Sequence, residues 1–243
     1  MTFQNAPGSG YGQPGDNRGV IINGQAQPAV QTAFLTQAFF WMFAGLLVTA
    51  AIAAFVQAND SLLRFAGRNL VLLFIGQIAL AIGIQWGIRR INATLALGLF
   101  FVYAASLGLT IGLIVTFYTN ESVVSAFLSA SAMFGGAAIY GYTTKRSLAS
   151  MGGYLSMGLF GLIVAIGVNI FLGSGPLGFI IAIIGVVIFT GLTAWDVQRI
   201  TAGGLVQATG SVEKAAVIGA LHLYLDFVNL FLFLLRIFGS GRR

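Results

Sequence analysis

The 243-residue sequence contains no cysteine, only one histidine and only six acidic residues. Without cysteine the chain forms no disulfide and no thiolate metal site. Because His222 is the only histidine, a metal site built from several histidines is also excluded. Charged residues make up 7% of the chain, whereas an ordinary soluble domain has roughly 25%. The sequence therefore lacks the surface chemistry of a water-soluble protein.

Apolar residues dominate what is present. They make up 58% of the chain, the mean hydropathy is +0.92, and several apolar runs exceed the roughly 20 residues that span a bilayer. Because lipid offers no partner to unpaired backbone groups, such runs must be helices. The sequence predicts an all-α, multi-pass membrane protein. Its formal charge of +6 comes from sparse basic residues that set topology, so no nucleic-acid partner is expected.

The apolar runs predict seven transmembrane helices with short connections. A Gly- and Pro-containing break at residues 173–178 divides the longest uncharged stretch into the fifth and sixth spans. The predicted spans are 33–57, 69–88, 92–117, 123–143, two spans on either side of 173–178, and 214–237. Residues 1–32 are rich in Gly, Gln, Asn and Pro, and we expect them to form a flexible tail before the membrane domain of residues 33–239.

The basic residues indicate an orientation for the seven spans. Seven lie on the side of the N-terminus and five on the opposite side. This bias predicts a cytoplasmic N-terminus and an external C-terminus in the inner (plasma) membrane. The first group is Arg18, Arg89, Arg90, Lys145, Arg146, Arg199 and Lys214, and the second is Arg64, Arg68, Arg236, Arg242 and Arg243.

Two acidic residues lie inside apolar runs, Asp196 in residues 178–200 and Asp226 in residues 214–236. The other four acids are in tail or loop positions. An ionisable group within the membrane costs about 3 kcal/mol even on lenient insertion scales, so it indicates a functional site. The structural alternative for Asp196 is an ion pair with Arg199, three residues further along the same helix.

Polar residues accompany each acid at helical spacing. One face of the last span carries Gly219, His222, Asp226 and Asn229, and one face of the preceding span carries Thr190, Thr193, Asp196 and Arg199. Two such faces predict a carboxylate pair, with His222 one turn from Asp226 as a tuning or packing residue. Asp226 is about 20 Å from the start of its helix, but Asp196 is about 6 Å from the end of its own. They meet only if the last helix begins beyond the membrane, or if the preceding helix continues past Ile200.

Small and polar residues in other spans predict helix–helix contacts. Gly108 and Gly112 form a G-x-x-x-G pattern, and Gly158, Gly161 and Gly167 recur along the fifth span. Close packing explains such glycines. Intramembrane amides, Gln77, Gln85 and Asn169, are expected to hydrogen-bond between helices.

Three motifs resemble the Bax inhibitor-1 family of membrane proteins: YGYTTKRSLASMGGYL (140–155), TAWDVQRI (193–200) and LHLYLDFVNLFLFLLRIFG (221–239). The resemblance covers residues 33–239. It implies a bundle in which six helices surround the last one, and a pH-sensitive calcium leak whose sensor is an aspartate pair. Those aspartates correspond to Asp196 and Asp226, and an arginine that latches onto the pair corresponds to Arg89 or Arg90. Some bacterial members have an acid within the second helix, where this chain has Gln77.

Physical chemistry is consistent with that role for the pair. Two adjacent carboxylates cannot both ionise cheaply; protonated, they share a hydrogen bond, and ionised, they repel unless a cation or an arginine enters. Calcium prefers oxygen ligands, and Asp196, Asp226 and Asn229 are candidates for some of them. Calcium would be the transported ion, and no cofactor is expected.

Other functions are compatible with the sequence. Some bacterial members of the family are partners of a membrane-bound ATP-dependent protease, so a regulatory or stress-response role is the main alternative to a leak. A proton-coupled carrier is another. An intramembrane aspartyl protease needs a G-x-G-D turn, and the residues before Asp196 and Asp226 are LTAW and LYL. We therefore expect no enzyme activity.

Overall fold

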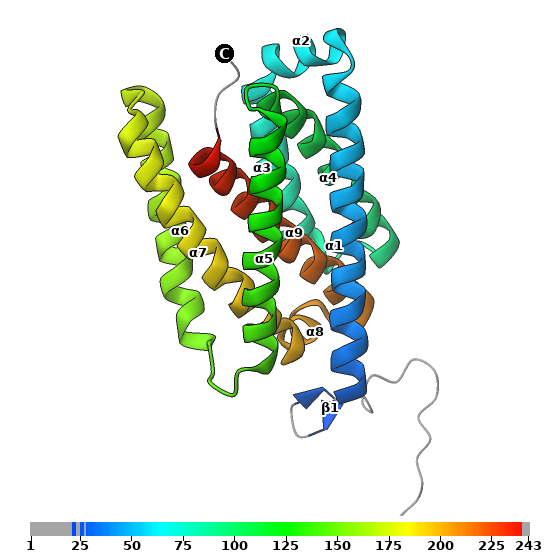
Figure 1. Ribbon diagram of the computed structural model, residues 1–243. Coiled ribbons are helices and arrows are strands. Elements are labelled where there is room, and N and C mark those ends of the chain that lie inside the picture. Colours follow the sequence, from blue (N-terminus) through cyan, green and yellow to red (C-terminus); the bar gives the residue numbers. More distant parts are fainter. Residues whose placement is uncertain (1–20, 23–24, 27, 240–243) are drawn as a thin grey trace, which may run out of the picture.

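Seven long helices form the protein, as a computed structural model shows for residues 21–22, 25–26 and 28–239 (Figure 1). Each of the seven is long and apolar enough to cross a membrane. The all-α membrane fold and all seven predicted spans are confirmed. The long helices are α1 (Pro28–Gln57), α3 (Leu70–Gly87), α4 (Ala93–Val115), α5 (Asn120–Thr143), α6 (Ala149–Leu172), α7 (Gly175–Thr201) and α9 (Val212–Phe238).

Two short helices, α2 (Asp60–Arg68) and α8 (Gly204–Thr209), were not predicted from the apolar runs. Helix α2 is polar, and the Asn59 side chain caps it by accepting from the Ser61 and Leu62 amides. Helix α8 lies between Gly203 and Gly210, whose φ angles of 75° and 78° favour glycine. Neither helix has the apolar length by which the spans were recognised.

The proposed flexible tail of residues 1–32 falls mostly outside the described residues. Within it, the strands β1 (Ile21–Ile22) and β2 (Gln25–Ala26) pair in antiparallel fashion. Helix α1 begins at Pro28, and its apolar, membrane-spanning part begins at Ala33.

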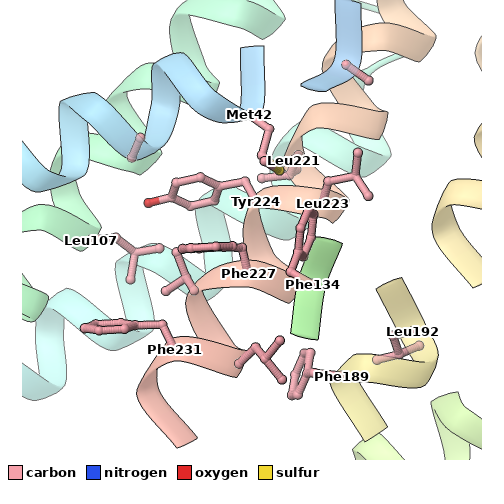
Figure 2. Packing of buried hydrophobic residues seen from close by; sticks show 14 of the residues in the cluster. Met42, Leu107, Phe134, Phe189, Leu192, Leu221, Leu223, Tyr224, Phe227 and Phe231 are labelled. Carbon is pink, nitrogen blue, oxygen red and sulfur yellow. The ribbon is translucent and has the colours of Figure 1, made fainter. Parts of the chain in front are cut away.

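Helix α9 is the centre of the bundle. Its apolar window is 72% buried, compared with 6% for α6 and 17% for α3, so the predicted central position of the last helix is confirmed. Figure 2 shows large α9 side chains, including Tyr224, Phe227 and Phe231, packed among residues of the surrounding helices. The Thr49 hydroxyl donates to a backbone carbonyl, so the Tyr224 phenol, 2.6 Å away, donates to Thr49 and ties α9 to α1.

Glycines allow the closest helix contacts. A Cβ atom at Gly108 or Gly112 would lie 2.9 Å from a backbone oxygen of α1, that of Thr49 or Ala53. The predicted close packing is therefore confirmed for this pair. It is wrong for Gly161 and Gly167, where a Cβ atom would have nothing within 4 Å, because α6 lies on the outside of the bundle.

The first and last spans begin and end at opposite ends of the bundle (Figure 1), as an odd number of spans requires. A reporter fused after Arg243 is expected to be active only if it functions outside the cytoplasm, because the basic residues favour a cytoplasmic N-terminus. The measurement uses two fusions after Arg243: one to an enzyme that is active only outside the cytoplasm, and one to a fluorescent protein that is active only inside it. Cytoplasmic activity at this position would contradict the orientation.

Candidate functional site

The two intramembrane acids lie together in the bundle interior. Asp196 of α7 is 6% exposed and Asp226 of α9 is 4% exposed, and their side chains interact directly. Helix α7 ends at Thr201, so continuation past Ile200 does not explain the meeting. Instead α9 runs obliquely across the bundle (Figure 1), and its first turns pack against α8. The oblique path brings Asp226 to the level of Asp196.

The pair has few hydrogen-bond donors of its own. Asp196 Oδ1 and Asp226 Oδ2 are buried and make no hydrogen bond among the described residues. The Thr193 side chain also interacts with Asp226, but its hydroxyl donates to the Phe189 carbonyl at 2.8 Å. A buried polar atom left unpaired costs about 1–3 kcal/mol. A proton shared by the carboxyls, or a cation between them, would remove that cost.

His222 faces Asp196, not Asp226. Its Nδ1 lies 3.4 Å from Asp196 Oδ1, and its Nε2 lies 3.2 Å from Gln85 Oε1. His222 and Asp226 were expected to share a helix face, with His222 tuning Asp226. The direct contact of the ring is with Asp196 of the neighbouring helix, because residues on one face both look toward that helix, and a tuning role stays a prediction. Gln85 Oε1 accepts from the Nε2–H of the ring, so in a neutral ring Nδ1, which faces Asp196, is an acceptor.

A row of polar side chains thus leads from α3 to the acids: Gln85, His222, Asp196 and Asp226. Gln85 and His222 also line a cavity of about 240 Å³, together with Arg89 and Arg199. The row therefore connects this cavity with the buried pair through polar side chains.

The arginines do not contact the pair in this conformation. Arg89 donates from Nε to the Ala208 carbonyl of α8 at 2.9 Å, and Arg90 is exposed. Arg199 lies 5.2 Å above the Trp195 ring, so it does not form the helix-end ion pair with Asp196. Among the described residues, the basic side chain within ion-pair distance of this pair is that of His222, which contacts Asp196. A latch by Arg89 or Arg90 stays a prediction for another state.

Asn229 is also directed elsewhere. Its amide donates to the Leu225 carbonyl of its own helix at 2.8 Å, and it lines a second cavity of about 590 Å³. The polar neighbour of the acids is Thr193, whose sequence signal was its position three residues before Asp196 on the same polar face. Gln77 hydrogen-bonds to Thr110 of α4 at 2.9 Å, as predicted for an intramembrane amide.

Comparison with known proteins assigns the chain to a family. Residues 31–243 match the family described as "Inhibitor of apoptosis-promoting Bax1". The chain belongs to this family. Inner membrane protein YbhL of Escherichia coli (strain K12) is 40% identical over 224 residues, which are 90% of this chain and 95% of YbhL. The match to the Bax1 inhibitor family covers all seven spans.

Two further relatives come from distant bacteria. A Borreliella burgdorferi protein is 40% identical over 218 residues, 88% of this chain and 94% of its own length. Protein YrjE of Lactococcus lactis is 37% identical over 212 residues, 85% of this chain and 90% of its own. The similarity therefore extends over nearly the whole length of proteins from several bacteria.

Proposed function

We propose that this chain is a passive calcium leak of the bacterial inner membrane, with its N-terminus in the cytoplasm, whose pH dependence is set by Asp196 and Asp226. The observation that carries the proposal is the pair itself. The two acids in the interior of the spans come from different helices, meet in the bundle core, and keep oxygen atoms without a donor. A buried carboxyl oxygen without a donor can bind either a proton or a cation.

The ligand chemistry of the pair favours a transient calcium contact. Calcium takes six to eight oxygen ligands in a stable site, and the two carboxyls with the Thr193 hydroxyl supply fewer. In the described part of the chain, no three or more His, Cys, Asp and Glu side chains gather into a metal-holding group. Weak, incomplete coordination suits passage of the ion rather than its storage.

Calcium efflux from liposomes tests the proposal. Purified full-length protein in calcium-loaded liposomes, with an external calcium dye, should release calcium faster than protein-free liposomes. A leak should not saturate at low calcium concentration and should need no proton gradient. Saturation and gradient dependence would instead indicate a carrier. Absence of flux at every pH would contradict a leak and favour the regulatory, protease-binding alternative.

Replacing the latch arginine is expected to raise basal leak at high pH, where an unpaired dianion costs most. Arg89→Ala should raise it by about fivefold or more, since even a solvent-exposed ion pair can contribute about 1 kcal/mol and these acids are buried. Arg89 lines the cavity beside His222, whereas the neighbouring Arg90 does not, so Arg90→Ala is the matched control. Unchanged leak in both variants, measured in the same liposomes, would eliminate the latch.

His222→Ala is expected to move the midpoint of the flux profile to higher pH, by about half to one pH unit. His222 Nδ1 lies 3.4 Å from Asp196 Oδ1, and a positive charge at such a distance favours an ionised carboxyl, so we expect a higher midpoint once the ring is removed. Gln85→Leu removes the other partner of the ring and keeps the contact with Asp196, so it should shift the midpoint less than His222→Ala does. A midpoint that does not move in His222→Ala would assign this residue a packing role only.

A further inference from the structure

The cavity of about 590 Å³ lies between α3, α4, α6, α7 and α9, near the end of α9. Most of its wall is apolar, including Ile114, Ile170 and Leu232. Two polar groups stand at its end: Asn169 in the last turn of α6 and Arg236 in the last turn of α9. Its volume is that of a typical small-molecule site.

Both polar groups lack partners within the described residues. Arg236 is exposed and makes no hydrogen bond and no ion pair there, and Asn169 Oδ1 is buried without a hydrogen bond. A methyl group at Gly178 would overlap the Arg236 guanidinium, so this cation packs directly on the first turn of α7. Because the start of a long helix carries partial positive charge, the guanidinium and this turn repel each other. An anion and a hydrogen-bond donor would satisfy the site.

We propose that this cavity binds an anionic glycerophospholipid such as phosphatidylglycerol, independently of calcium flux. The phosphate pairs with Arg236, the polar side chain of Asn169 lies in the cavity wall, and an acyl chain follows the apolar residues. A lipid fits better than a free anion because the two polar groups lie in the end turns of spanning helices, at the level of headgroups. Helices α3 and α6, which border the cavity, are also the least buried of the spans, so the site adjoins the bilayer. A guanidinium group forms strong, charge-assisted hydrogen bonds with phosphate, so an arginine beside an apolar wall matches both parts of such a lipid.

Native mass spectrometry of the purified full-length protein tests the site. Titration with phosphatidylglycerol and with phosphatidylcholine should show tighter binding of the anionic lipid. Arg236→Gln should weaken phosphatidylglycerol binding about fivefold, the effect of one basic residue near a membrane surface, and leave phosphatidylcholine binding unchanged. Arg68→Gln is the matched control. This exposed arginine of α2 lies at the same end of the bundle (Figure 1), outside the cavity.

A second variant keeps the test independent of folding defects in Arg236→Gln. Gly178→Ala keeps the charge but displaces the guanidinium, which is the flexible end of a side chain, and should also lower the preference for phosphatidylglycerol. Equal binding of the two lipids by the wild type, or wild-type phosphatidylglycerol binding by both variants, would overturn the proposal. Displacement of the lipid by millimolar inorganic phosphate would identify a free anion as the ligand instead.

Discussion

Either Asp196→Asn or Asp226→Asn is expected to flatten the pH response of calcium flux between about pH 5 and 8, the interval in which buried, paired carboxyls exchange protons. Asparagine keeps the shape of the side chain and removes its titration. The two carboxyls lie together in the bundle interior, and we expect neighbouring carboxyls to exchange protons as a unit, so that losing one member removes the response of both. In the wild type, the calcium flux should differ about tenfold between the two ends of this pH range, which is equivalent to about 1.4 kcal/mol. In each variant the difference should fall below about twofold.

The matched control for the single variants is Thr190→Val. Thr190 lies on the same face of α7, but its hydroxyl donates to the Val186 carbonyl of its own helix at 2.7 Å. The flux profile of this variant should match that of the wild type. The double Asn variant should add little to either single change, because coupled residues do not contribute additively. A single variant that keeps the wild-type slope would show that the acids titrate separately.

The largest expected effect on stability is that of Gly141→Ala. A Cβ atom at Gly141 in α5 would run into the Ala194 backbone of α7, two residues before Asp196. Backbone atoms in a helix cannot move aside as a side chain end can, so α5 and α7 must separate. Overpacking of this kind costs about 1–3 kcal/mol. The melting temperature in detergent should fall accordingly.

Gly136→Ala on the same helix provides the comparison. Nothing lies within 4 Å of a Cβ atom at Gly136, and alanine in a helix is more favourable than glycine by about 0.5–1 kcal/mol. This variant should therefore be as stable as the wild type or slightly more stable. Equal melting temperatures for Gly141→Ala and Gly136→Ala would contradict the tight contact between α5 and α7.

The spans were predictable because their signal is local. An apolar run of sufficient length must cross the bilayer as a helix whatever its neighbours are, and all seven follow from this rule. Helices α2 and α8 do not, because their caps and glycine turns lie in polar connections. The central position of α9 was implied by the family resemblance. Its oblique path, which brings Asp226 to Asp196, depends on packing against α7 and α8 and has no local signal.

The candidate site was predictable in its members and less so in its contacts. Helical spacing placed His222 and Asp226 on one face, but the structure turns that face so that the ring meets Asp196. Gly161 and Gly167 were expected to pack closely as Gly108 and Gly112 do, yet only Gly108 and Gly112 have atoms of a neighbouring helix within 4 Å of a Cβ position. Spacing defines which residues share a face. Which neighbour that face meets depends on how each helix is rotated in the bundle.

The most direct measurement is calcium flux through wild-type protein and the Asp196→Asn, Asp226→Asn double variant, in liposomes of one composition across a pH series from about 5 to 8. Both proteins should reconstitute equally, as judged by the same melting temperature in detergent. The wild type should show a steep pH dependence and the double variant a flat one. A steep dependence that survives in the double variant would contradict the assignment of pH sensing to this pair.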